Sequence, residues 1–164
     1  MPVRPRQPAD LPACAASLRR VHEASGYPSR WPDDPAAWIT PRSMVAAWVA
    51  EHDGEVAGHV ALVRGLNLEC LLRATGLPVE ALGGIVRLYV DPGFQRLGLA
   101  RVLLDTATAA AVDRGLRPAL DVVDDSAPAI ALYERAGWKL AGTQPATWTD
   151  PDGSIPLIRC YIGP

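Results

Sequence analysis

Runs of apolar residues recur along the chain between short groups of turn residues, and they predict a series of β-strands. Each run is rich in β-branched or aromatic residues and is bounded by Gly, Pro or Asp. The predicted strands span residues 1–6, 47–52, 55–64, 85–90, 118–123, 138–148 and 154–162. The first is predicted as a short edge strand, because an edge tolerates Pro2 and Pro5, which have no backbone N–H to donate.

Between the strands, apolar residues return at helical spacing and predict helices. These helices span residues 9–24, a short turn after 34–35, two pieces at 67–74 and 78–82, a long helix ending at Gly115, and 127–136. In the long helix, Leu99, Leu103 and Ala107 share one face. The order of strands and helices predicts a mixed α/β domain covering residues 1–164.

Local signals mark where several of these elements begin and end. Asp10 is a candidate N-cap for the first helix, and Gly26 a stop. Asp53-Gly54 favours a two-residue hairpin with positive φ. Asp124, Asp125 and Ser126 are candidate caps, and Gly137 ends the last helix.

The stretch from Ile85 to Leu104 carries the strongest chemical signal. A buried strand runs into the turn Asp91-Pro92-Gly93, and a helix is predicted to begin just past residue 94. The first turn of a helix leaves backbone N–H groups without partners, and the helix dipole adds partial positive charge there. Residues 95–100 are therefore a predicted phosphate site, where Gly98 and Ala100 are small enough to let an anion approach.

This stretch resembles the GCN5-related N-acetyltransferase (GNAT) family. The family's pyrophosphate signature is Gln or Arg, two residues, Gly, one residue, then Gly or Ala, and it stands here as Gln95, Gly98 and Ala100. A second family element follows at residues 126–138, where Leu132-Tyr133-Glu134 precedes Gly137-Trp138. Ser126 replaces the Asn that usually begins this element, and its shorter side chain still offers a hydroxyl.

The resemblance implies a central, mostly antiparallel sheet with one splayed parallel strand pair and helices on both faces. It also implies transfer of an acetyl group from acetyl-coenzyme A (acetyl-CoA) to a primary amine of a small molecule or peptide by direct attack. Tyr133 would be the general acid, because a phenol is protonated at neutral pH and can donate to the departing thiolate. The implied cofactor-binding residues are Leu88, Tyr89, Val90, Gln95, Arg96, Leu97, Gly98, Leu99, Ala100, Arg101 and Ser126. Among these, the Val90 N–H would stabilise the oxyanion, and Leu88 and Tyr89 would pair with pantetheine.

The general base is left open by the sequence. Many relatives carry a Glu six residues before the valine that binds the acetyl group, and Gly84 occupies that position here. Glu80, Asp121, or a water-mediated route through His22 or His59 are the alternatives.

Residues 25–41 contain several prolines and aromatic residues and are predicted to form mostly a loop, with Asp34 capping one short helix. We expect Tyr27 and Trp31 to form a lid over the acceptor amine. The equally weighted alternative is that these rings cover the core from outside.

Composition narrows the remaining choices. Charged residues make up 21%, the net charge is −2, and no run of Lys or Arg exceeds two residues, which argues against nucleic acid as a partner. The three cysteines are far apart and are expected to be free thiols in a reducing compartment. With no apolar run of membrane-spanning or signal-peptide length, we expect a cytoplasmic protein with no membrane partner.

The three histidines lack metal-ligand spacing, so no metal site is expected. A homodimer is compatible with the sequence. Two other functions stay open beside the enzyme: a CoA-binding module without catalysis, which Gly84 permits, and a protein-interaction domain that uses the aromatic loop and the last strands.

Overall fold

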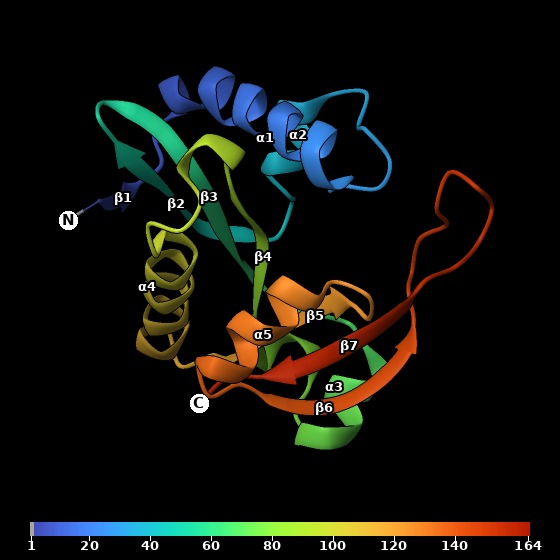
Figure 1. Ribbon diagram of the computed structural model, residues 1–164. Coiled ribbons are helices and arrows are strands. Elements are labelled where there is room, and N and C mark those ends of the chain that lie inside the picture. The colour runs from blue at the N-terminus through green and yellow to red at the C-terminus, as the bar shows by residue number, and fades with distance from the viewer. Residues whose placement is uncertain (1) are drawn as a thin grey trace. The chain divides into compact units, whose positions relative to one another are not determined.

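A computed structural model describes residues 2–164 of the chain (Figure 1). The seven strands are β1 (Val3–Pro5), β2 (Met44–His52), β3 (Glu55–Arg64), β4 (Leu82–Val90), β5 (Arg117–Val123), β6 (Lys139–Pro145) and β7 (Leu157–Ile162). The α-helices are α1 (Leu11–Ser25), α2 (Pro35–Ile39), α3 (Glu69–Thr75), α4 (Leu99–Asp113) and α5 (Ala127–Arg135). Three 3-10 turns, η1 (Pro8–Asp10), η2 (Val79–Ala81) and η3 (Pro92–Phe94), complete the described elements.

The strands form a mixed, mostly antiparallel sheet in the order β1-β2-β3-β4-β5-β7-β6. The parallel pair is β4 with β5, in register from Leu82 opposite Arg117 to Gly84 opposite Ala119. β1 pairs antiparallel with β2, which confirms the predicted edge strand, while Met1 lies outside the described residues. This is the predicted α/β fold class.

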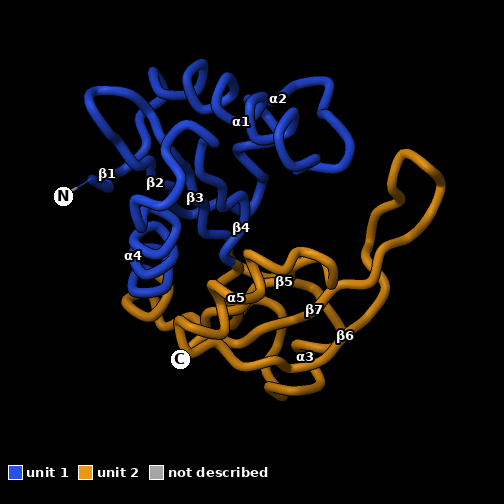
Figure 2. The backbone as a smooth tube through the Cα atoms, viewed as in Figure 1, with its two compact units in different colours: residues 1–63, 85–110 blue, residues 64–84, 111–164 orange. Residues whose placement is uncertain are grey.

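The chain divides into two compact units (Figure 2). Unit 1 contains Met1–Val63 and Ile85–Ala110, and unit 2 contains Arg64–Gly84 and Ala111–Pro164. β4 begins in unit 2 and continues in unit 1. The single domain expected over residues 1–164 stays a prediction.

Unit 1 is built around a core beneath α1 and α2. The buried members of this core are Cys14, Leu18, Val21, Ile39, Val49 and Tyr89. The hairpin from β2 to β3 turns at Asp53 and Gly54, with φ of 52° and 78°, as the dipeptide predicted. Asp34 caps α2 by accepting from the Ala37 N–H at 3.1 Å, which was also predicted.

Unit 2 packs α3 against the hairpin of β6 and β7, whose connecting loop projects beyond the strand ends (Figure 1). Its core consists of Leu68, Leu71, Leu82, Ala119, Ile158 and Cys160. Asp124 was predicted as a helix cap, but it accepts from Arg159 at 2.5 Å instead. Ser126 occupies the N-cap position of α5 without a side-chain hydrogen bond.

The cysteine prediction is wrong for two of the three residues. Cys70 on α3 and Cys160 on β7 form a disulfide, although 90 positions separate them in sequence. The contact arises because α3 packs against β7, which brings the two Cα atoms to 6.6 Å. Cys14 is a buried free thiol, and burial raises its pKa to about 11.

Candidate functional site

The loop predicted to bind phosphate, residues 95–98 and called the phosphate loop below, lies between η3 and α4 in unit 1. Gln95 is extended, with φ −70° and ψ 161°, and Arg96 follows with a positive φ of 66°. Gly98 is left-handed as well, at φ 76°. Successive backbone N–H groups in turn conformations can form concavities that bind anions.

The long helix begins later than predicted. α4 starts at Leu99, so Gln95 to Gly98 form a loop before the helix instead of its first turn. The difference has a backbone cause, because the positive φ of Arg96 and Gly98 is incompatible with a right-handed helix. The N–H groups of Leu99 to Arg101 are the ones that open the helix without intrahelical acceptors.

Side chains of the phosphate loop are exposed, and Leu97 shows 50% of its surface to solvent. A Cβ added at Gly98 would meet nothing within 4 Å, so φ, and not space within the protein, is what requires glycine there. The Arg101 side chain pairs with Asp105 at 3.0 Å on the exposed face of α4. Arg96 is the exposed arginine inside the loop itself.

Asp91 anchors the turn that leads into the loop. Its carboxylate accepts from the Arg20 guanidinium at 2.6 Å and from the Gly93 N–H at 2.9 Å, and the residue is 2% exposed. Burial acts to raise the pKa of this carboxyl, but the bonds from Arg20 and Gly93 outweigh it, so the pKa is lowered. The turn therefore holds an ionised aspartate tied to α1.

Gly58 on β3 has no side chain, which allows α4 and β4 to pack close to β3 at this position. A Cβ at this position would lie 2.9 Å from the Tyr89 carbonyl oxygen and 3.0 Å from Leu103 Cδ1. Sequence reasoning missed this residue. A glycine inside a predicted strand was the available signal, since it often marks a close backbone approach.

The end of β4 presents alternate backbone groups to its two sides. The Asp91 N–H donates to the Ala57 carbonyl on β3 at 2.8 Å, and the Tyr89 carbonyl also lies on the β3 side, near Gly58. Since strand residues alternate, the backbone groups of Leu88 and Val90 point away from β3. The Tyr89 side chain is buried and donates to the Cys14 carbonyl at 3.0 Å, and burial raises its pKa.

Tyr133 lies in unit 2, in the last turn of α5. The residue is 8% exposed, and its ring centroid is 6.0 Å from Tyr161 and 6.3 Å from Trp138. The backbone carbonyl of Tyr133 accepts from the Trp138 N–H at 3.0 Å, which closes the helix end. The phenol is thus set in an aromatic cluster of this unit.

The base candidates differ in their surroundings. Glu80 lies exposed on η2, and Asp121 lies on β5 opposite Cys160. Gly84, at the position of the usual glutamate, is buried in β4. His22 has its Nδ1 2.6 Å from the Pro28 carbonyl, so that nitrogen carries the proton.

His59 is fully buried and both ring nitrogens have protein partners. Nε2 lies 3.0 Å from Arg6 Nη1, and Nδ1 lies 2.9 Å from the Arg87 carbonyl oxygen. Burial lowers the pKa of the imidazole to about 4, so the ring is neutral at neutral pH. These contacts make it a structural group more than a proton acceptor.

The two residues of the predicted acceptor lid differ in their exposure. Tyr27 is 37% exposed and meets Trp38 edge-on, at 5.8 Å between centroids. Trp31 packs against the core of unit 1 and lies under the Arg19 guanidinium, at 4.9 Å. Tyr27 is therefore the more exposed of the two predicted lid residues.

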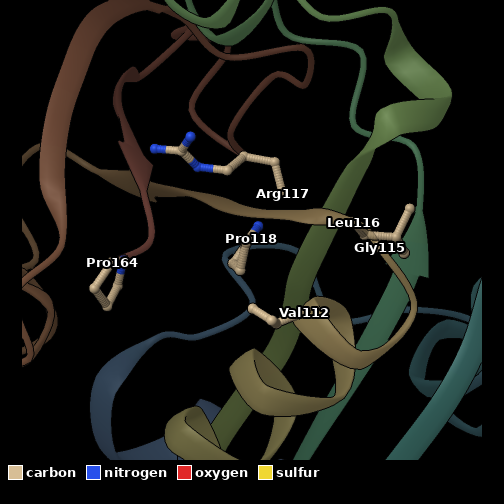
Figure 3. A pocket seen from close by; sticks show the side chains of 6 residues that line it. All are labelled: Val112, Gly115, Leu116, Arg117, Pro118 and Pro164. Atoms are coloured by element: carbon tan, nitrogen blue, oxygen red, sulfur yellow. The ribbon is translucent and has the colours of Figure 1, made fainter.

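An open hollow is present in unit 2, where the end of α4 leads into β5 (Figure 3). Its lining residues are Val112, Gly115, Leu116, Arg117, Pro118 and Pro164. Arg117 is the one ionisable member, so the hollow lacks groups for acid–base chemistry. Within residues 2–164, no group of three or more His, Cys, Asp or Glu side chains could hold a metal ion, and no helix could cross a membrane.

β4, a loop with two residues of positive φ, and α4 follow one another in the order that the sequence motif predicts. Comparison by sequence gives the family: its model, described as acetyltransferase (GNAT) family, matches residues 13–138. The chain belongs to the GNAT family, whose members use acetyl-CoA.

Curated and solved relatives agree with this family. A mycothiol acetyltransferase of Cellulomonas flavigena is 31% identical over 127 residues, covering 74% of this chain and 35% of that protein. This chain therefore spans about a third of that relative's length. The ribosomal-protein-alanine N-acetyltransferase of Brucella melitensis has a TM-score of 0.75 at 20% identity, with 99% of this chain and 98% of that chain covered. The NAA60 protein of Arabidopsis thaliana in complex with acetyl-CoA has a TM-score of 0.73 at 21% identity, with 98% and 96% covered, and both structures show the same fold.

Proposed function

We propose that this chain transfers an acetyl group from acetyl-CoA to a primary amine of a small molecule or peptide. The observation that carries the proposal is the phosphate loop, with left-handed Arg96 and Gly98 at the start of α4, in a chain of the GNAT family. Acetyl-CoA would supply the thioester.

The phosphate loop has the groups that a diphosphate requires. Backbone N–H groups from Gln95 to Arg101 would hold the oxygens, and the Arg96 side chain adds a guanidinium nearby. The loop's exposure leaves these groups accessible. Arg101 is committed to Asp105, so we assign it a backbone contact only.

The carboxyl end of β4 has groups for the rest of the cofactor. The geometry favours Leu88 and Val90 over Tyr89 as partners of the pantetheine arm, because the Tyr89 carbonyl lies on the β3 side. The Val90 N–H would donate to the thioester carbonyl oxygen as negative charge develops on it. Fixed donors of this kind often supply the largest single catalytic contribution.

Tyr133 is our candidate general acid, and Ser126 a further cofactor contact. As the carbon–sulfur bond breaks, a positioned phenol can donate its proton to the departing sulfur, whose thiol has an unperturbed pKa of about 8.5. The attacking amine must lose a proton, since its unperturbed pKa is about 10.4. His22, Glu80 or Asp121 would accept it, directly or through water; His59 suits this role poorly because Arg6 and the Arg87 carbonyl occupy its nitrogens.

The proposed acceptor is a primary amine of a small molecule or peptide. The names of the relatives specify mycothiol acetylation in one case and acetylation of a ribosomal-protein alanine in another. Tyr27, exposed beside Trp38, is the residue of the predicted lid that we propose to contact the amine substrate, and Trp31 would support the loop from beneath. Binding without catalysis is the second candidate function, favoured by the buried Gly84 in the place of a glutamate.

Two measurements test the proposal in sequence. Isothermal titration with acetyl-CoA should show binding, and its absence would remove both candidates. A thiol-release assay across small amines, amino acids and peptide N-termini should then show turnover for the enzyme, whereas binding with no turnover for any amine supports the second candidate.

The acid role has a matched control in the same unit. Tyr133→Phe should lower kcat by about 10²-fold or more, with little change in the affinity for acetyl-CoA. Tyr161→Phe removes another phenol, one that donates to Glu134 at 3.1 Å, and should leave kcat within about threefold. Equal effects of the two variants would remove Tyr133 as the acid.

A further inference from the structure

A part-buried network in unit 1, centred on the buried His59, holds an unusual residue of β4. Arg87 has φ 55° inside the strand, a left-handed conformation that is costly for a residue with a side chain. Such a residue interrupts the regular alternation of a strand. It therefore determines which of the following N–H groups face β3 and which face away.

His59 fixes the backbone at this residue. A carbonyl only accepts, so the 2.9 Å contact with the Arg87 oxygen requires a proton on Nδ1. A guanidinium only donates, so the 3.0 Å contact with Arg6 requires a lone pair on Nε2. Arg6 thus selects the tautomer that lets His59 donate to Arg87, and the burial-lowered pKa of the ring keeps it neutral.

The Arg87 side chain is held from α2. Its Nε donates to the Trp38 carbonyl at 2.9 Å, and its guanidinium carbon lies 3.8 Å from the Trp38 ring centroid. Arg6 reaches the same segment, donating to the Ile39 carbonyl at 3.2 Å and to Thr40 Oγ1 at 2.8 Å. The left-handed residue is therefore fixed through both its carbonyl and its side chain.

We propose that Arg6, His59 and Arg87 form a positioning cluster. Its contacts fix Arg87 in the left-handed conformation and thereby aim the Val90 N–H away from β3. Val90 lies three positions after Arg87, and the Asp91 N–H donates to the Ala57 carbonyl at 2.8 Å as this alternation requires. The inference rests on the proposed function, in which Val90 is the donor to the developing oxyanion. The cluster's residues touch no substrate in this account.

Three replacements of His59 separate its two hydrogen bonds. His59→Asn places an amide near Nδ1 and keeps the donor to Arg87, whereas His59→Gln places one near Nε2 and keeps only the acceptor for Arg6. His59→Phe removes both. Val63→Ala is the matched control, because Val63 is a buried residue four positions further along the same strand.

The first readout needs no cofactor. In two-dimensional ¹H–¹⁵N spectra of the cofactor-free protein, the Leu88 and Val90 amide signals should move strongly in His59→Phe and His59→Gln, and little in His59→Asn and Val63→Ala. Unmoved Val90 signals in His59→Phe would overturn the proposal. This test stands even if the chain proves to have no transferase activity.

The second readout is the split between kcat and KM. His59→Phe and His59→Gln should lower kcat by about tenfold or more, with a smaller change in KM for acetyl-CoA, because the phosphate loop is untouched. His59→Asn should recover most of the rate. A rate that instead follows thermal stability across all four variants, Val63→Ala included, would make His59 a core residue only; a wild type without activity would end the proposed function and leave the amide readout to decide.

Discussion

Arg20 on α1 donates to the buried carboxylate of Asp91 at 2.6 Å, and this ion pair ties the first helix to the turn before the phosphate loop. The same carboxylate accepts from the Gly93 N–H at 2.9 Å. One aspartate therefore connects two parts of unit 1 that are 71 positions apart in sequence. Its ionisation state has measurable consequences.

Removing the Asp91 charge should destabilise the protein in a pH-dependent way. Asp91→Asn should lower the free energy of unfolding by about 1–3 kcal/mol at neutral pH, because Arg20 and the Gly93 N–H lose a charged acceptor. The folded-state pKa is lowered, so the ionised form stabilises the fold above the unfolded pKa of about 3.9, and this contribution is lost as pH falls through the folded pKa. In urea unfolding, the difference in the free energy of unfolding between wild type and Asp91→Asn should therefore shrink as the pH falls from about 6 to about 3.

Asp105→Asn is the control for that experiment. Asp105 pairs with Arg101 on an exposed face, where such a pair contributes about 0–1 kcal/mol. A constant difference between wild type and Asp91→Asn across the pH range would contradict the assigned role of the charge.

Gly98→Ala should weaken acetyl-CoA binding beyond its effect on stability. The φ of 76° makes alanine strained by about 1–2 kcal/mol, although a Cβ meets nothing within 4 Å. Gly115→Ala is the matched control, because Gly115 has φ 71° and equally open surroundings. Gly115 follows the C-terminal end of α4, away from the phosphate loop. We expect equal stability losses from both and an affinity loss, by calorimetry, from Gly98→Ala alone.

Gly58→Ala should destabilise unit 1 through overpacking. The added Cβ would lie 2.9 Å from the Tyr89 carbonyl oxygen, and backbone cannot move aside cheaply. A loss of about 1–3 kcal/mol in urea unfolding is expected. Gly142→Ala on β6 is the control, because its added Cβ would lie 3.4 Å from Cys70 Cβ, close to an ordinary contact distance. It should lower the free energy of unfolding less than Gly58→Ala does. A larger loss from Gly142→Ala would refute the packing assignment.

The Cys70–Cys160 disulfide predicts a definite thiol count. Denatured, unreduced protein should react at one thiol, Cys14, and reduced protein at three. Because the bond closes a loop across 90 positions, reduction should lower the free energy of unfolding by roughly 2–4 kcal/mol. Three reactive thiols before reduction would show that the bond is absent.

Local signals predicted most elements of the fold. Asp53-Gly54 determined a hairpin because both residues tolerate positive φ, and Asp34 capped a short helix as its position indicated. The start of α4 was missed, since neither Gln95 nor Arg96 disfavours a helix by composition. Arg96 nevertheless has a positive φ of 66°, which no pattern of residues around it indicated.

Contacts between distant segments explain the other differences. Cys70 and Cys160 pair only because α3 packs on β7, and Asp124 meets Arg159 across the β5–β7 register instead of capping α5. The tautomer of His59 likewise depends on Arg6, which lies 53 positions earlier in the sequence. Family motifs located the candidate cofactor residues, whereas nothing in the pattern of residues identified the positioning cluster.

The central claim is that backbone N–H groups at residues 95–101 hold the diphosphate of acetyl-CoA. Amide chemical shifts measured in ¹H–¹⁵N spectra during titration with acetyl-CoA test it most directly. We expect the largest shifts at Arg96 to Arg101, with saturation at the calorimetric affinity and loss of the effect in Gly98→Ala. Saturating binding that leaves these amides unmoved would contradict the claim.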